Sequence, residues 1–232
     1  MSVSEGAQPY EGLADRLQAV QQGIAEACRA AGRDAAETTL IVVTKFHPAA
    51  LVRELAALGV ADVGENRHQE AQEKAADLAD LDLNWHYIGQ LQTKKARQAA
   101  QYASAIHSID RARLIDALAP IERSLDVFLQ INLTDDPGRG GAAPSEIEAL
   151  TERILETPTL RLRGVMAVAP LEEPASAAFA RLAGYSERVR ALAPDATDIS
   201  AGMTHDYAEA IAAGATHLRI GSAITGNRPD AR

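Results

Sequence analysis

Two patterns of apolar and polar positions alternate along the chain and predict strands and helices in turn. Short apolar runs rich in β-branched residues are typical of strands buried in a parallel sheet. Eight such runs are predicted as strands: residues 39–44, 60–64, 84–88, 105–108, 125–131, 160–168, 197–200 and 216–220. Amphipathic stretches with helical spacing separate them, beginning near Pro48, Asn66, Gln92, Asp110, Pro144, Pro174 and His205.

A further helix is predicted before the first strand, over residues 10–31, and Gly32 ends it. Strands that alternate with helices favour a parallel sheet, and eight of them are what a closed barrel requires. We therefore expect a single α/β domain over residues 1–232, a (β/α)8 TIM barrel with an extra N-terminal helix and about residues 1–9 flexible. A doubly wound open sheet is the alternative.

The composition indicates a soluble cytoplasmic protein. One cysteine, Cys28, excludes an intrachain disulfide, and residues 1–8 lack the basic start and apolar run of a signal peptide. No apolar run approaches the length of a membrane span. A formal net charge of −9 disfavours binding to nucleic acid or to an anionic membrane. We expect a cytoplasmic monomer that binds neither.

Lys45 lies at the carboxyl end of the first predicted strand, just before Pro48 stops the strand and opens a helix. In folds built from strand–helix units, ligands bind at this end of the sheet. Burial penalises the charged form of a lysine, so apolar walls would favour a neutral amine that can form a Schiff base with a carbonyl. A lysine that extends from the strand end into water is the alternative.

Glycine-containing turns follow the seventh and eighth predicted strands. Gly202 and Gly221 allow a ligand to approach the backbone closely, and Ser200 and Ser222 add hydroxyl donors. In barrels of this type a phosphate commonly binds between these two loops, at the start of a short extra helix. Helix capping is the alternative role for each residue, but two such turns at the expected places favour a phosphate site.

A Schiff-base lysine and a phosphate site together suggest one ligand, pyridoxal 5′-phosphate (PLP). Its aldehyde would reach Lys45 while its phosphate occupies the glycine turns. Arg219, at the end of the eighth strand, is placed to face the pyridine nitrogen. Because an arginine is always charged and cannot accept a proton, it would keep that nitrogen unprotonated. A structural ion pair is the alternative role of Arg219.

Nearly the whole chain resembles the family of pyridoxal phosphate homeostasis proteins, which look like the barrel domain of alanine racemase standing alone. Six segments carry the resemblance: VTKFHP (43–48), GENRHQE (64–70), WHYIGQLQTKK (85–95), LRGVM (162–166), SAGM (200–203) and GATHLRIGS (214–222). It implies that Lys45 carries PLP, that Arg219 meets the ring nitrogen, and that the cofactor is lined by Asn66, His86 and Met166. It also implies that the phosphate is surrounded by Ser200, Gly202, Met203, Gly221 and Ser222.

Some of these residues have alternative roles. Asn66 begins a predicted helix, so it is as suited to cap that helix as to contact a ligand. His86 lies on the face of its strand opposite to its two aromatic neighbours, and a hydrogen-bonded core histidine is its alternative role. His205 and His217 are expected to be structural, and the histidines show no metal-ligand spacing, so no metal is expected.

The sequence departs from the family pattern at a few positions. His47 stands where the family usually has a second lysine, and Arg139 replaces a lysine in the loop after the fifth strand. Thr225 replaces the usual phenylalanine near the end. None of these changes removes an expected cofactor contact. They leave open whether accessory side chains accept or pass on a second PLP, because arginine and histidine do not replace lysine in that chemistry.

The resemblance implies a non-catalytic carrier or regulator of PLP supply, with apo forms of PLP-dependent enzymes as partners. A PLP-dependent amino-acid racemase or another PLP enzyme is the first alternative, and a cofactor-free Schiff-base aldolase is the second. Racemization needs acid and base groups on both faces of the substrate. In the racemase a tyrosine of a separate domain supplies one of them, and we expect no such domain in this chain.

Overall fold

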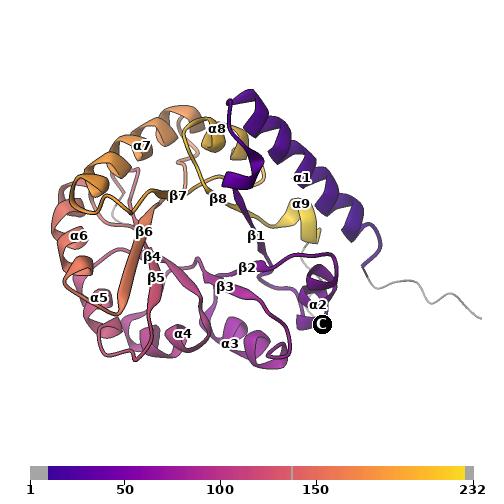
Figure 1. The fold of residues 1–232 in the computed structure, drawn as a ribbon, viewed down its shortest axis with the longest axis horizontal. Helices are drawn as coiled ribbons and strands as arrows, with labels where there is room; N and C mark the ends of the chain where they lie inside the picture. Colours follow the sequence, from indigo (N-terminus) through magenta and orange to yellow (C-terminus); the bar gives the residue numbers. More distant parts are fainter. Residues whose placement is uncertain (1–9, 137, 228–232) are drawn as a thin grey trace, which may run out of the picture.

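Eight parallel strands close into a barrel in the order of the sequence (Figure 1). The computed structural model describes residues 10–136 and 138–227, so the expectation of flexibility at residues 1–9 lies outside the described residues. The strands are β1 Thr39–Val43, β2 Asp62–Glu65, β3 Asn84–Tyr87, β4 Ala105–Ile109, β5 Leu125–Gln130, β6 Leu160–Met166, β7 Asp198–Ser200 and β8 His217–Ile220. The predicted (β/α)8 barrel is confirmed, and the open-sheet alternative is wrong because β1 pairs with both β2 and β8.

Helices form a ring outside the barrel, as Figure 1 shows. They are α1 Leu13–Ala30, α2 Ala49–Ala57, α3 His68–Asp77, α4 Ala96–Tyr102, α5 Ala112–Leu118, α6 Ile147–Leu155, α7 Ala175–Leu192, α8 Tyr207–Ala212 and α9 Ser222–Thr225, with short 3-10 turns at Ala35–Glu37, Thr93–Lys95 and Pro144–Glu146. The predicted N-terminal helix is therefore present as α1. None of the helices in the described residues is long and apolar enough to cross a membrane.

The strand boundaries differ from the prediction by at most two residues. β2 begins at Asp62, two residues later than expected, and β6 ends at Met166, two residues earlier. In both places the apolar run continues past the end of the strand, because buried residues just outside a strand are as apolar as those within it. Val60 illustrates this, since it is buried but lies outside β2.

The barrel interior is unusually polar. Interiors of this fold are normally filled by branched apolar side chains. Here one small apolar cluster, Ala105, Phe128 and Met166, is separate from the large core between strands and helices. The remaining buried side chains at the inward-facing positions include His86, His107, Ser200 and Arg219. Burying a polar group costs free energy unless the group forms hydrogen bonds, so these side chains need partners. Their partners build the site described below.

We expect Gly164→Ala to destabilise the barrel. Gly164 is in β6 with a φ of +155°, and an added Cβ would lie 1.8 Å from the Asp198 carbonyl oxygen of the neighbouring strand. Because that atom belongs to the backbone, β6 and β7 would have to separate, at a cost of about 3 kcal/mol. Denaturant unfolding measures the effect.

Gly184→Ala is the matched control for this prediction. Gly184 is in α7, where an added Cβ would meet no atom within 4 Å. Alanine there is expected to raise the free energy of unfolding by up to about 1 kcal/mol, because it has the higher helix propensity. Equal stability of Gly164→Ala and the wild type would contradict the packing described for β6.

Candidate functional site

Lys45 lies in the turn between β1 and α2, and its side chain is exposed. Its Nζ lies 5.9 Å from the centroid of the Phe46 ring. The expectation that apolar walls enclose this lysine is therefore wrong, and the alternative, a side chain that reaches water, describes the structure. Strand β1 ends at Val43, so the chain has already turned when it reaches Lys45. The assignment of Lys45 as the PLP lysine stays a prediction.

A buried ion-pair cluster lies behind the Lys45 turn. Lys74 Nζ, on α3, is 2.6 Å from Glu65 Oε1 and 2.7 Å from Glu70 Oε1. The same ammonium donates to the Thr44 carbonyl at 2.8 Å, and Thr44 Oγ1 donates to Glu65 Oε1 at 2.7 Å. Burial raises the pKa of Glu65, although the charge of Lys74 opposes the shift. The cluster thus joins β2 and α3 to the end of β1.

Both neighbours of Lys45 are held by this cluster. The Thr44 carbonyl accepts from Lys74, and the Phe46 N–H donates to Glu70 Oε1 at 2.5 Å. Phe46 has a φ of +69°, which is strained for a residue other than glycine and persists only where the surroundings hold it. No sequence pattern singles out Lys74, because its spacing from Glu70 is that of an ordinary surface pair on a helix.

The end of β8 lies beside the end of β1. Arg219 is paired with the middle of β1, and a Cβ on Gly221 would lie 3.3 Å from the Val43 carbonyl oxygen. The next residue, Ser222, begins the short helix α9. The ladder between the two strands therefore brings Arg219, Gly221 and Ser222 to the same barrel end as the Lys45 turn.

The turn after β7 approaches the same place. Gly202 has a φ of +91°, and a Cβ there would lie 2.8 Å from the Ala210 side chain. Its carbonyl accepts from the Arg219 N–H at 2.9 Å, which ties the turn to β8. Met203 is half-exposed, and its N–H donates to Asp206 Oδ1 at 2.5 Å. That N–H is engaged in a capping turn, and Gly202 itself is buried, with Ala210, Tyr207 and Leu218 packed where a side chain would lie.

Arg219 extends into the barrel interior and is buried. Its Nη1 donates to Ser200 Oγ at 2.7 Å and its Nη2 donates to the Ala167 carbonyl at 2.8 Å. Among the described residues it forms no ion pair, so the structural ion pair considered for Arg219 does not describe its contacts. Burial lowers its pKa to about 10, although the charge of Asp206 opposes the shift, and the group stays charged at neutral pH.

Ser200, His86 and Met166 lie inside the barrel, below its carboxyl end. The Ser200 hydroxyl, expected at the phosphate, bonds instead to Arg219 and to His107 Nδ1 at 2.8 Å. His86 bonds to His107 Nε2 at 2.9 Å and to Asp62 Oδ1 at 2.9 Å. Met166 packs in the interior apolar cluster. These three residues support the site from below.

The side chain of Asn66 lies at the start of the loop before α3, and its Oδ1 is buried without a partner in the described part of the chain. A Cβ on Gly89 would lie 2.1 Å from the Asn66 carbonyl oxygen, which also accepts from Tyr87 Oη at 3.3 Å. The backbone of Asn66 is thus fixed, while its amide keeps one polar atom for a ligand. No side-chain cap of α3 is formed, so the capping alternative does not describe Asn66.

His107 and Asp62 were missed by the sequence analysis. His107 is the third residue of β4 and is fully buried, and Asp62 is the first residue of β2. A signal for them was present, because a polar residue at an inward-facing position of a strand, like His86, needs a polar partner, and here the partners lie on the two neighbouring strands. The register between neighbouring strands sets the partner, and no local pattern encodes that register.

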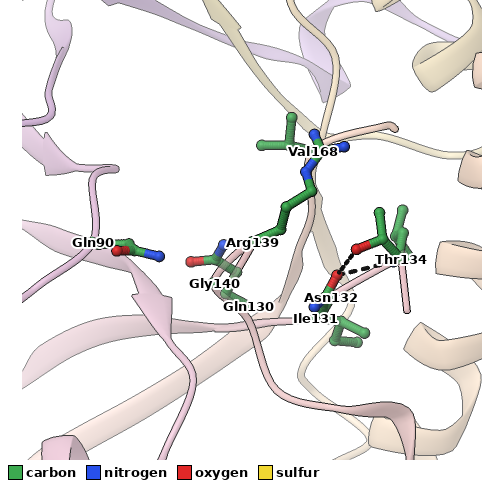
Figure 2. A pocket seen from close by; sticks show the side chains of 9 residues that line it. Gln90, Gln130, Ile131, Asn132, Thr134, Arg139, Gly140 and Val168 are labelled. Carbon is green, nitrogen blue, oxygen red and sulfur yellow. Dashed lines mark hydrogen bonds between the residues drawn. The ribbon is translucent and has the colours of Figure 1, made fainter. Parts of the chain in front are cut away.

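A polar cavity of about 190 Å³ opens on the β5–β6 side of the barrel end. Figure 2 shows Gln90, Gln130 and Arg139 around it, with Asn132 Oδ1 accepting from the Thr134 N–H and hydroxyl at 2.9 and 2.8 Å. Arg139 lies in the loop after β5. The barrel end therefore offers amide and guanidinium groups beyond the predicted site residues.

The groups at this end fit the predicted PLP. Lys45 supplies an accessible amine for the aldehyde, and Arg219 supplies a fixed cation. Asn66 has an unused polar atom, and the turns at Gly202 and Gly221, where a side chain would meet neighbouring residues, lie at the same barrel end. No group of histidine, cysteine, aspartate and glutamate side chains in the described residues could hold a metal ion.

Comparisons with known proteins agree with this architecture. Residues 16–229 match the family model described as the N-terminal domain of alanine racemase. A pyridoxal phosphate homeostasis protein of Pseudomonas aeruginosa is 43% identical over 223 residues, which cover 93% of this chain and 96% of that protein. The structure of PipY of Synechococcus elongatus with PLP bound has a TM-score of 0.80 at 35% identity and covers 92% of this chain and 100% of PipY. Alanine racemase of Corynebacterium glutamicum shares the fold, with a TM-score of 0.65 at 17% identity over 90% of this chain and 60% of the racemase.

We expect Lys74→Met to destabilise the protein and to loosen the Lys45 turn. The substitution leaves the Glu65 carboxylate buried without its cation and the Thr44 carbonyl without its donor. Breaking a buried pair in this way costs about 3 kcal/mol or more. Denaturant unfolding measures the loss, and amide hydrogen exchange at Phe46 reports the turn.

The control is Arg53→Met, which breaks an exposed pair with Asp80 and should change stability little. If the two variants are equally stable, the buried cluster does not anchor the turn.

Proposed function

The chain belongs to the family of pyridoxal phosphate homeostasis proteins, and from this premise we propose that it binds PLP at the carboxyl end of its barrel as a carrier or regulator of PLP supply. The observation that carries the proposal is the pairing of β1 with β8. That ladder brings an accessible lysine, a buried arginine and a glycine turn to one barrel end. An amine, a cation and an anion-binding turn are what an aldehyde with a phosphate and a ring nitrogen requires.

Lys45 would hold PLP covalently. Its Nζ would bond the aldehyde carbon of PLP with loss of one water, and the turn fixed by Thr44 and Phe46 would present it. Arg219 would donate to the ring nitrogen and keep it unprotonated, with Ser200 and Ala167 as its supports. Bound PLP supplies an electrophilic carbon next to an electron-withdrawing ring.

The phosphate would bind between the turns after β7 and β8. The turns at Gly202 and Gly221 pack closely against neighbouring residues because they carry no side chains, and the exposed Ser222 would add a hydroxyl. Met203 would border this site through its half-exposed side chain. Asn66 would use its free amide atom on the ring, whereas His86 and Met166 would support the floor of the site.

A carrier role is favoured over catalysis by the exposure of Lys45. Water at the reacting atoms weakens the electrostatic stabilisation on which carbanion chemistry depends. An arginine at the ring nitrogen also weakens the electron sink. The same exposure would let PLP leave for an acceptor protein. Racemase activity is the alternative, because the racemase shares the barrel.

We further propose that residues 1–232 act as one PLP-binding domain, as a monomer in the cytoplasm. The acidic net charge of −9 supports the absence of nucleic-acid and membrane partners. Apo forms of PLP-dependent enzymes are the partners that would accept PLP.

Reduction with borohydride after incubation with PLP should label Lys45. The chain has four lysines, Lys45, Lys74, Lys94 and Lys95, so peptide mass mapping identifies the labelled residue directly. Lys45→Ala should lose the label and the visible absorption band, yet keep some PLP through the phosphate contacts. Lys94→Ala removes another exposed lysine and should keep both signals. A label on any lysine other than Lys45 contradicts the assignment, and the cofactor-free aldolase predicts a protein that holds no PLP chromophore.

Added amino acids should not be turned over. In deuterated water, the loaded protein should exchange the α-protons of several L-amino acids no faster than free PLP does, because no water-excluded site forms around Lys45. Proton NMR of the amino acids measures the exchange. Rapid exchange that disappears in Lys45→Ala would establish the enzyme alternative instead.

A further inference from the structure

Arg219 carries a buried charge whose direct partners are both neutral. The guanidinium donates to the Ser200 hydroxyl and the Ala167 carbonyl. No carboxylate lies within ion-pair distance of it among the residues that the structure describes. A buried charge is costly unless a counter-charge or a polarised set of hydrogen bonds compensates it. Arg219 therefore needs a source of negative potential farther away.

Hydrogen bonds continue from Arg219 across the whole interior of the barrel. Ser200 Oγ lies 2.8 Å from His107 Nδ1, and His107 Nε2 lies 2.9 Å from His86 Nδ1. His86 Nε2 then lies 2.9 Å from Asp62 Oδ1, at the start of β2 and hence at the opposite end of the barrel. We call this connected set the Asp62 relay; its members are Asp62, His86, His107 and Ser200.

The chemistry of Arg219 and Asp62, at the two ends of the hydrogen-bonded row, fixes the direction in which its members donate. An arginine only donates, and an ionised carboxylate only accepts. Burial alone would raise the pKa of Asp62, but hydrogen bonds from His86 and Asn84 hold it below its usual value, so it is ionised at neutral pH. Nε2 of His86 must therefore carry a hydrogen, which it donates to Asp62.

When both imidazoles are neutral, the positions of the remaining hydrogens are fixed as well. A neutral imidazole has one N–H, so His86 Nδ1 accepts and His107 Nε2 must donate to it. His107 Nδ1 then accepts the hydroxyl hydrogen of Ser200, whose oxygen accepts from Arg219. Burial lowers the pKa of His107 well below its usual value, which agrees with a neutral ring, and the ring stacks on Phe128 at 4.2 Å.

His217 lies near the relay but does not belong to it. Its ring centroid is 6.4 Å from that of His86 and 6.1 Å from that of His107, and its Nδ1 bonds to Thr216 Oγ1 at 2.8 Å. Burial lowers its pKa to about 4, although the charge of Asp198 opposes the shift. It is therefore a neutral neighbour at neutral pH.

We propose that the Asp62 relay positions Arg219 and connects its buried charge to the Asp62 carboxylate at the far end of the barrel. The hydroxyl hydrogen of Ser200 is committed to His107, so Ser200 presents its oxygen to Arg219 and has no hydrogen left for a phosphate. Asp62, His86 and His107 act through Arg219 and touch no ligand. Their effect on bound PLP rests on the proposed function, in which Arg219 donates to the ring nitrogen.

The direction of the relay can be measured without PLP. Nitrogen-15 NMR of the imidazole rings, at about pH 8.5 and so above the usual titration range of histidine, reports which nitrogen carries the hydrogen. We expect Nε2–H on both His86 and His107, with signals assigned from His86→Gln and His107→Gln. Asp62→Asn keeps an acceptor oxygen and should preserve both tautomers. In Asp62→Ala, the hydrogen of His86 should no longer be held on Nε2. A hydrogen on Nδ1 of either ring in the wild type overturns the relay.

The positioning role is tested on the loaded protein. Asp62→Ala should shift the visible absorption band of bound PLP and weaken PLP binding at least about fivefold, because Arg219 loses its counter-charge. Asp62→Asn, which removes the charge but keeps the hydrogen bond, should shift the band in the same direction. Asp80→Asn, an exposed carboxylate paired with Arg53, is the control and should change neither.

Two outcomes separate the relay from the proposed function. Folded Asp62 variants with the wild-type band and affinity overturn the positioning role, even if their stability has changed. A wild-type protein that binds no PLP overturns the proposed function, and the tautomers of the ligand-free protein then still decide whether the relay exists.

Discussion

Closure of the parallel sheet is the constraint on which the site depends. Strand β1 must pair with β8 as well as β2, so residues about 180 positions apart in the chain share one ladder. That ladder sets the distance between the Lys45 turn and Gly221, and it fixes the depth at which Arg219 enters the interior. A sheet that remained open would leave these groups at opposite edges. The topology of the sheet, and no single side chain, brings the site residues together.

The barrel accommodates two buried cations in different ways. Lys74 is neutralised locally by Glu65 and Glu70, and the resulting cluster stiffens the turn around Lys45. Arg219 has neutral partners, and negative charge reaches it through a row of polar groups. The first arrangement holds a backbone in place. The second keeps a guanidinium available, because a carboxylate directly on Arg219 would compete with a ligand for its N–H groups.

Sequence patterns predicted the fold because each buried strand can be recognised from a local run of apolar residues. Each apolar run marks one strand, and the alternation with helices leaves few topologies. The details of the site were harder to predict from the sequence. Lys45 was expected to be enclosed because it follows a buried run, yet β1 ends at Val43 and Lys45 lies in an exposed turn, whose next residue, Phe46, is held by Glu70 of another element. Ser200 was expected at the phosphate, but its hydroxyl is used by His107, a partner that only the closed barrel supplies.

The Asp62 relay connects the two ends of this barrel, which normally have separate roles. In barrels of this architecture, the face at the amino ends of the strands normally serves stability, and the face at the carboxyl ends holds the ligand. Here a carboxylate on that face, Asp62, is joined through the interior to the arginine that faces the ligand end. A side chain on the amino-terminal face thereby bears on the ligand end of the barrel, although it lies at the opposite end of the interior.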